Sequence, residues 1–338
     1  MAAHKIRTWT KNILQLVAGI LIIVIIIVAL QNISGYVQVQ GTPPGWTILR
    51  PPHEVSTLLI VNDTVWTGGK EGIIQVDRIT GNAVIPRDAP SFGYVRQIIM
   101  DRSGTIWIGH DGGLVKYRDA RWQVIAPGPG IPFTKVLSIT ERHDGSIVIG
   151  TDADLFSYDG LKWQSLLKEN GPAIASVDVL YEDLSGDLWV GCGALMHGSL
   201  YRLQGTRWQQ FSVNDGLPHP AVRAITQDRN GTLWVATGYS RSGGAALLNK
   251  GIWTNITRAD GLAGESTRSV YQDTAGRMWV SSEYDGVAVR INGSWKIFTE
   301  KDGLAGYEVK IIRQDPDGTY WLGTNLGLSR IVPEYIFL

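Results

Sequence analysis

The sequence of 338 residues contains a single cysteine, Cys192, and has no excess of charge of either sign. One cysteine cannot form a disulfide within the chain, so the cysteine content leaves the redox compartment open. The 31 lysines and arginines equal the 31 aspartates and glutamates in number. The chain as a whole therefore has no field that would draw it onto nucleic acid or an anionic lipid surface, and we expect no nucleic-acid partner.

Familiar catalytic patterns are also lacking. The nucleophile elbow Gly-x-Ser-x-Gly is absent, because the stretch "GYSRS" at 238–242 ends in serine. The six histidines contain no close pair, so a metal site would need His197 and His219 to converge through folding. The stretch "TGGKEG" does not have the spacing of a phosphate-binding loop. We expect no catalytic residue, metal or cofactor.

Only one long hydrophobic run occurs, near the N-terminus, where 18 residues up to Leu30 contain Gln15 as their only polar member. As a helix at ~1.5 Å per residue, this run covers roughly 27 Å of a hydrocarbon core that is ~30 Å thick. It exceeds the ~7–15 residues typical of a cleaved signal peptide, and no small-x-small cleavage pattern follows it. We therefore predict a basic cytoplasmic stub (1–12), a transmembrane helix (13–31) and a linker (32–43), with the remainder outside the cytoplasm.

The rest of the chain repeats one phrase seven times, as in "DRNGTLWVATG" at 228–238. The steps between the central residues of the copies are 41, 41, 41, 45, 45 and 42 residues. A period in the forties with tryptophan-centred strands is typical of a β-propeller in which each repeat forms one four-stranded blade. We expect these central residues to pack between neighbouring blades as anchors: Trp66, Trp107, Val148, Trp189, Trp234, Trp279 and Trp321.

Each unit contains a strand that ends in an Asp-x-x-Gly turn, a tryptophan-centred strand, a glycine-rich loop, a third strand and a fourth strand led by another tryptophan, as in "RWQQF" at 207–211. The seventh unit lacks the fourth strand, whereas "GWTIL" at 45–49, with Trp46, matches it. Pairing of these two ends would remove the free edge of an open array. We therefore predict an all-β, seven-bladed β-propeller over 44–338, closed by both ends of the chain in the last blade.

The stretch "VRAITQDRNGTLWVATG" followed by "WTNITRADGL" resembles the two-component regulator propeller repeat. The "DGL" element of that repeat recurs at 215–217, 260–262 and 302–304, and the resemblance extends over 44–338. It is weaker in the early units, where Val148 replaces a tryptophan. The resemblance implies the extracytoplasmic sensor part of a signalling protein, in which a further β-domain, a membrane helix and a kinase usually follow. Because none follows here, we expect a separate partner to supply the output.

The loops of such a propeller alternate between two faces. The uniform Asp-x-x-Gly turns and the third-to-fourth strand turns share one face, the turn face; the diverse second-to-third strand loops and the connections between blades share the other, the variable face. We expect long loops in the fourth and fifth blades, and binding on the variable face, since function concentrates in loops on a rigid scaffold. The candidate binding residues are Met196, His197, Tyr239, Arg241, Glu283 and Tyr284, followed by His110, Asp111, Asp152 and His219.

Two functions remain from the sequence. The first is a membrane-anchored, sensor-like module that binds a protein partner or a small extracellular ligand, such as a carbohydrate. The alternative is an extracytoplasmic lyase or hydrolase that acts on a carbohydrate or small molecule. The lack of a catalytic constellation favours the first. Because the chain enters and leaves the propeller on the turn face, we expect that face to lie toward the membrane.

Overall fold

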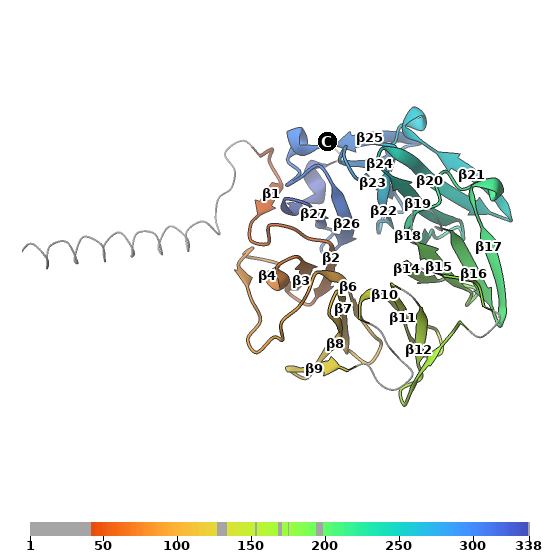
Figure 1. Cartoon of the computed structure of the whole chain (residues 1–338). Coiled ribbons are helices and arrows are strands. Elements are labelled where there is room, and N and C mark those ends of the chain that lie inside the picture. Colours follow the sequence, from red (N-terminus) through yellow and green to blue (C-terminus); the bar gives the residue numbers. More distant parts are fainter. Residues whose placement is uncertain are drawn as a thin grey trace, which may run out of the picture.

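The computed structural model describes residues 42–126, 134–152, 154–167, 171–174, 176–193 and 199–336. In this part of the chain the strands form seven sheets of four strands, arranged in a ring (Figure 1). The prediction of an all-β, seven-bladed propeller is confirmed. No helix within the described residues is long and apolar enough to cross a membrane, and the predicted transmembrane helix lies outside them.

In the first six blades, four consecutive strands run from the centre of the ring to its edge. Blade 1 contains β2 (Thr57–Val61), β3 (Thr64–Gly69), β4 (Gly72–Asp77) and β5 (Ala83–Val84). Blade 2 contains β6 (Val95–Met100), β7 (Ile106–His110), β8 (Gly113–Arg118) and β9 (Arg121–Ile125). Blade 3 contains β10 (Val136–Glu141), β11 (Ile147–Thr151), β12 (Leu155–Tyr158) and β13 (Trp163–Ser165).

Blades 4 to 6 follow the same order, and a short 3₁₀ helix follows the fourth strand of each. Blade 4 contains β14 (Val177–Glu182), β15 (Leu188–Cys192), β16 (Leu200–Gln204) and β17 (Arg207–Phe211), followed by η2 (Val213–Asp215). Blade 5 contains β18 (Val222–Gln227), β19 (Leu233–Tyr239), β20 (Ser242–Asn249) and β21 (Ile252–Ile256), followed by η3 (Arg258–Asp260). Blade 6 contains β22 (Thr267–Gln272), β23 (Met278–Ser282), β24 (Val287–Ile291) and β25 (Ser294–Phe298), followed by η4 (Glu300–Asp302).

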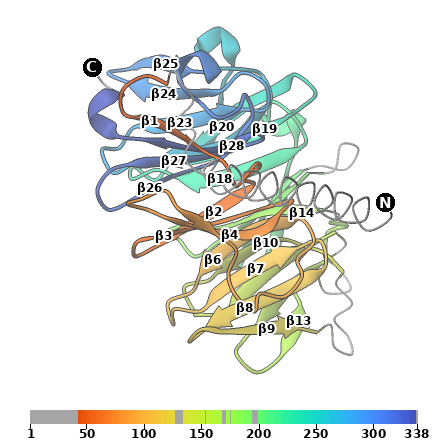
Figure 2. The same cartoon turned by 90° about the vertical axis from the view of Figure 1, so that its left-hand side faces the viewer.

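Blade 7 is assembled from both ends of the propeller, as predicted. It contains β26 (Val309–Gln314), β27 (Tyr320–Thr324), β28 (Gly327–Ile331) and, as its outer strand, β1 (Trp46–Leu49), with η5 (Pro333–Tyr335) after β28. Trp46 lies opposite Ile331 in the antiparallel ladder, and the amide of Val332 donates to the carbonyl of Gly45 at 2.9 Å. The orange-red β1 accordingly lies along the blue strands of this blade in both views (Figure 1 and Figure 2).

The burial of the strands follows their distance from the centre. Second strands such as β7 and β27 are buried along their whole length, while fourth strands such as β9 and β21 are partly exposed. Apolar clusters lie between neighbouring blades: Trp107 of blade 2 packs with Val136 and Ile139 of blade 3. The eight residues predicted as anchors, Trp46 and the seven central residues of the repeat, are all at most 4% exposed.

The aspartate that begins each Asp-x-x-Gly turn also holds the tryptophan. Oδ1 of Asp101 accepts the amides of Ser103 and Thr105, each at 2.9 Å, and Oδ2 accepts Nε1 of Trp107 at 2.7 Å. One carboxylate therefore fixes both the turn and the indole that packs against the next blade. The indole contact recurs at 2.8–3.1 Å in four more blades, between Asp183 and Trp189, Asp228 and Trp234, Asp273 and Trp279, and Asp315 and Trp321.

Blade 3 lacks both members of this pair. Val148 stands where the other blades have tryptophan, and Arg142 stands where blades 2 and 4 to 7 have the turn aspartate. Arg142 instead joins blade 3 to blade 4, with its Nε 3.0 Å from Oε1 of Glu182 and its Nη2 donating to the carbonyl of Gly186 at 3.0 Å. The two substitutions belong together, because a buried carboxylate without the indole donor would lose one of its compensating hydrogen bonds.

The prediction of a long loop in blade 5 is wrong, because the residues concerned form the end of a hairpin. The strands β19 and β20 continue past the usual end of the blade, up to the pair Tyr239 and Ser242. A two-residue turn closes this hairpin, with positive φ at both Ser240 (50°) and Arg241 (63°), as the twist of a tight hairpin requires. The extra residues therefore project as a rigid hairpin on the variable face. The long loop expected in blade 4 lies partly outside the described residues.

Candidate binding site at the mouth of the central channel

The first strands of the blades enclose a central cavity of about 530 Å³. Its mouth is a cavity of about 250 Å³. The mouth opens on the variable face, because its wall is formed by residues at the beginning of the first strands, whereas the turns follow the end of those strands. The residues that line the mouth are Ser56, Tyr94, Arg96, Leu137, Asp178, Arg223, Arg268 and Lys310.

Six of these residues occupy one position, the second residue of the first strand in blades 2 to 7, and we call them the ring residues: Arg96, Leu137, Asp178, Arg223, Arg268 and Lys310. The register between the first and second strands shifts at this position in every one of these blades, for instance between Val95 and Gln97. Such bulges redirect a side chain. The preceding residue remains buried between the sheets, while the ring residue faces the channel.

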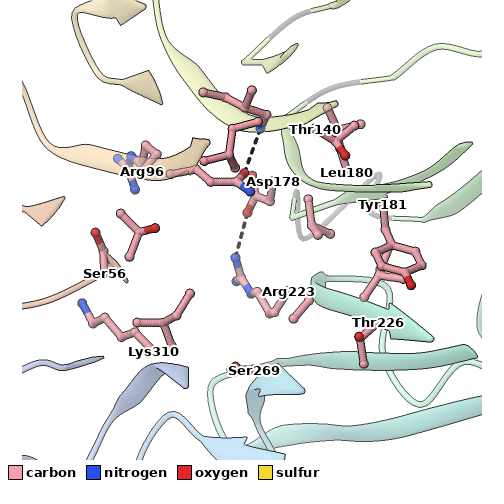
Figure 3. Close-up of a pocket in the computed structure, with 18 of the residues that line it drawn as sticks. Ser56, Arg96, Thr140, Asp178, Leu180, Tyr181, Arg223, Thr226, Ser269 and Lys310 are labelled. Carbon is pink, nitrogen blue, oxygen red and sulfur yellow. Dashed lines mark hydrogen bonds and ion pairs between the residues drawn. The ribbon is translucent and has the colours of Figure 1, made fainter. Parts of the chain in front are cut away.

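Two ion pairs hold the ring on the side of blades 2 to 5. Arg96 contacts Asp111 through Nε–Oδ1 (2.7 Å) and Nη2–Oδ2 (2.9 Å). Arg223 places Nη1 3.0 Å from Oδ2 of Asp178 and donates from Nε to the carbonyl of Gly238 at 3.2 Å. Figure 3 shows the Arg223–Asp178 contact, with Arg96 and Lys310 around the same opening. Arg223 thereby connects the channel mouth to the base of the blade 5 hairpin.

Two more ion pairs lie in blades 6 and 7. Arg268 contacts Oε1 of Glu308 with Nη2 (2.6 Å) and Nε (2.9 Å). Lys310 lies 2.5 Å from Oε1 of Glu54, and that oxygen also accepts the hydroxyl of Tyr94 at 2.5 Å. Glu54 precedes β2, Tyr94 precedes β6 and Lys310 belongs to β26. This cluster therefore joins blades 7, 1 and 2 at the place where the ring closes.

These contacts change how readily the groups ionise. Burial opposes ionisation of Glu54, but hydrogen bonds from Lys310 and Tyr94 outweigh it and lower the pKa of Glu54. Burial also opposes the charge of Lys310, yet the bond to Glu54 raises the pKa of Lys310. The pKa of Arg223 is lowered, chiefly by burial and then by the positive charge of Arg268 in the next blade. The Glu54–Lys310 pair is thus stabilised as ions, whereas two neighbouring guanidinium groups repel each other.

The structure places four of the predicted binding residues in blades 5 and 6, beside this mouth. The guanidinium carbon of Arg241 lies 4.8 Å from the ring centre of Tyr284, and that of Arg223 lies 5.9 Å from the ring centre of Tyr239. Tyr239 is 42% exposed. Glu283 accepts the hydroxyl of Ser266 at 2.7 Å. The hairpin of blade 5 therefore reaches blade 6 through an arginine–tyrosine contact.

The two described histidines among the predicted residues are held within the scaffold. Nδ1 of His110 accepts the amides of Gly93 and Gly112, each at 3.1 Å, and burial lowers the pKa of this histidine. Nδ1 of His219 accepts the amide of Ala221 at 3.0 Å, and its pKa is also lowered by burial. Both imidazoles act as neutral acceptors for loop amides.

The remaining predicted residues are dispersed. Asp111 contacts Arg96 beside the mouth. Asp152 is exposed in the connection between β11 and β12. Met196 and His197 lie outside the described residues. Within the described ranges, no group of three histidine, cysteine, aspartate or glutamate side chains could hold a metal ion.

The ring residues are absent from the sequence prediction, although the sequence carries a signal for them. They recur at steps of 41, 41, 45, 45 and 42 residues, in register with the tryptophans. Each follows a valine or threonine at the start of a strand. Binding residues were expected in the loops that differ between blades, whereas the ring residues lie at one position of a regular strand.

The fold is that of a seven-bladed β-propeller. Within it, residues 216–239 match the family described as two component regulator propeller, which confirms the predicted resemblance for this stretch. No curated protein matches the chain in sequence.

Solved structures give the same fold. The extracellular domain of BT3049 from B. thetaiotaomicron, assigned as a hybrid two component system, aligns with 87% of this chain at a TM-score of 0.73 and 18% identity. This chain spans only 42% of that chain. Virginiamycin B lyase from Staphylococcus aureus aligns over 84% of this chain and 97% of its own, at a TM-score of 0.64 and 14% identity. At these identities the likeness concerns the fold alone.

Proposed function

We propose that this chain is a membrane-anchored, extracytoplasmic, sensor-like module that binds a ligand or protein partner on its variable face, at the mouth of the central channel. The observation that carries the proposal is the ring: six blades place arginine, lysine, aspartate or leucine at one redirected position, and five of the six side chains are charged. Repeated tryptophans and turn aspartates already stabilise the blades. The ring residues place charges around the channel mouth, where they can select a binding partner.

The sensor part of the proposal draws on the repeat match and on the likeness to the extracellular domain of BT3049. The membrane part draws on the apolar run of residues 13–31. In this arrangement a separate partner receives the signal. The enzyme alternative has no specific observation in its favour, since the likeness to the lyase concerns the fold.

The position of the chain ends favours an orientation. Gly45 and Val332 are hydrogen-bonded to each other, and the Cβ position of Gly318, in a turn of the turn face, lies 3.5 Å from Pro333. Both ends of the described chain therefore lie at the turn face of blade 7. A short connection from residue 42 to the membrane would direct the variable face away from the bilayer, where a ligand or partner has access.

Site-directed labelling of the full chain in intact cells tests the location and the orientation. We expect a membrane-impermeant maleimide to label cysteine at Ser240 on the variable face faster than cysteine at Asn292 on the turn face. The native Cys192 is buried and gives little background. Absence of labelling at both positions until the cells are lysed would refute the extracytoplasmic location. Equal rates at both positions would refute the orientation.

Co-purification of the full chain from detergent-solubilised membranes tests the binding face. The double variant Tyr239→Ala, Arg241→Ala should lose partners that the wild type retains, while Asn292→Ala, on the turn face, should retain them. An identical set of partners for all three proteins would contradict a binding role of the variable face.

A further inference from the structure

The walls of the channel carry more positive than negative charge. Among the residues that line it, two carboxylates face five cations: Arg96, Arg223, Arg268, Lys310 and Arg313. The other carboxylates that pair with these cations are Glu54, Asp111 and Glu308, and none of these three lines the cavity. In these three pairs the cation lies toward the channel and the carboxylate behind it, whereas in the Arg223–Asp178 pair both partners line the channel.

The paired arginines keep unused donors. Asp111 takes Nε and Nη2 of Arg96, and Glu308 takes Nε and Nη2 of Arg268. Within the described residues, Nη1 of each arginine has no hydrogen-bond partner in the protein. Among the described residues, the Nη2 group of Arg223 also has no hydrogen-bond partner, since only its Nε and Nη1 form hydrogen bonds. A carboxylate behind a guanidinium fixes the orientation in which its remaining N–H groups are presented.

The carboxylates of Asp178 and Glu283 near Arg223 do not fully offset its burial and the neighbouring positive charge of Arg268. The pKa of Arg223 is lowered by burial and by the charge of Arg268, so the two guanidiniums oppose each other across adjacent blades. Deeper in the channel, Arg313 has a carbonyl and the ring of Tyr271 as neighbours, and no carboxylate among the described residues contacts it. An anion placed at the mouth would relieve this repulsion and form charge-assisted hydrogen bonds, which are about twice as strong as neutral ones.

We propose that the channel mouth binds a small anion that carries a carboxylate or a tetrahedral oxyanion, held by Arg96, Arg223, Arg268 and Lys310. This inference rests on the proposed function, since it assigns a ligand class to the same face. The mouth cavity of about 250 Å³ lies below the ~300–1,000 Å³ typical of pockets for drug-sized ligands. The ligand is therefore of the size of a dicarboxylate, a single sugar acid or a phosphorylated or sulfated monosaccharide.

Calorimetric titration of the full chain in detergent, at constant ionic strength in an amine buffer with chloride, tests the proposal. The probes are succinate, D-glucuronate, inorganic phosphate and sulfate, with D-glucose as the neutral control. At least one anion should bind, and D-glucose should not. The pattern among the four distinguishes a carboxylate ligand from a tetrahedral oxyanion.

Three variants make the test specific. The double variant Arg96→Gln, Arg268→Gln should weaken binding of that anion at least tenfold. Arg118→Gln removes one positive charge from an exposed residue outside the channel wall and should leave the affinity unchanged. Leu137→Arg adds a cation at the one apolar ring position and should tighten binding severalfold. Circular dichroism and melting temperatures show whether each variant is folded.

Two results would overturn the inference: no anion binds more tightly to the wild type than to the double variant, or D-glucose binds as well as the anions. Either result would leave the co-purification and labelling outcomes untouched, because those measurements use none of these probes. Failure of the anion site is therefore distinguishable from failure of the binding role of the variable face.

Discussion

At the scale of single residues, the main repeated interaction is the hydrogen bond between the turn aspartate and the indole of the tryptophan. The sequence indicated that Asp-x-x-Gly forms a turn and that tryptophan packs between blades, but not that one carboxylate joins the two. In blade 3 the loss of both Asp and Trp is visible in the sequence at Arg142 and Val148. Their coupling follows only from the hydrogen bond, which lies in the tertiary structure.

The substitution Asp228→Asn tests this pairing. The amide that replaces Oδ2 would present N–H groups to Nε1 of Trp234, so a buried charge-assisted bond becomes a contact between two donors. We expect a loss of ~1.5–3 kcal/mol in the free energy of unfolding, the range for hydrogen bonds to charged groups, measured by chemical denaturation. The control is Asp144→Asn, whose exposed carboxylate in the turn of blade 3 holds no indole. Equal losses in both variants would contradict the pairing.

The two histidines with lowered pKa values, His110 and His219, predict a dependence of stability on pH. Burial lowers the pKa of His110 and His219 in the folded protein, so below the unfolded value of ~6.5 the unfolded chain binds more protons than the folded one. The free energy of unfolding should therefore decrease as the pH falls from about 6.5 toward the lower folded values. Melting temperatures between pH 7.5 and 5.5 should fall less steeply in the variant His110→Gln, His219→Gln. A slope equal to that of the wild type would refute this role.

At the scale of elements, the three "DGL" segments add contacts between consecutive blades to those of the apolar clusters. Asp260 accepts the amide and hydroxyl of Thr257 and thereby closes a capping box around η3. Gly261 follows with φ of +108°, and its Cβ position lies 2.9 Å from Cδ1 of Trp295 in the outer strand of the next blade. The equivalent Gly303 lies against Trp46 in the same manner, so Trp46 occupies the place of an outer-strand tryptophan in blade 7.

Replacement of these glycines should therefore be costly for two reasons. In Gly261→Ala the left-handed backbone is strained and the new methyl group meets Trp295. In the control Gly251→Ala the φ of +81° is strained as well, but no atom lies within 4 Å of the methyl position. We expect Gly261→Ala to lose ~1–3 kcal/mol more than the control, the usual penalty for overpacking, by chemical denaturation. A smaller loss than in the control would contradict the packing role.

The sequence predicted the blades better than it predicted their edges. The repeated phrase and the spacing of the tryptophans located the second and fourth strands. The hairpin of blade 5 was missed because "TGYSRSGG" has the composition of a loop, while the glycines and the turn at Ser240–Arg241 allow the strands to continue. The ring residues were missed because a register shift, and not the sequence period, directs them into the channel.

At the scale of the whole molecule, the closure of the ring was predictable by counting. The last unit lacks a fourth strand, and a spare strand precedes the first unit. Pairing of the two completes the last blade, and the ladder between β1 and β28 is this pairing. The ligand chemistry was not predictable in this way, since the net charge of zero conceals a channel wall where cations outnumber carboxylates.

The variant Trp46→Ala tests the contribution of closure. Trp46 is 4% exposed and packs against Phe298, with 5.4 Å between the ring centres. We expect a loss of ~3–5 kcal/mol in the free energy of unfolding, as for other buried aromatic residues. Trp208→Ala, in the half-buried outer strand of blade 4, should lose less. If the weakened β1 detaches, the freed edge of β28 should promote dimers or larger species, which light scattering would detect.

The pairing of β1 with β28 also sets an order for the biogenesis of the protein. Trp46 is among the first propeller residues to be synthesised, and its partner Ile331 is among the last. At ~5–20 residues per second, ribosomes need on the order of 15–60 s to cover that separation, so β1 must wait unpaired for that time. Six blades can form during translation, but the seventh cannot. A nascent chain would therefore expose one unpaired strand until the residues of β28 have been synthesised.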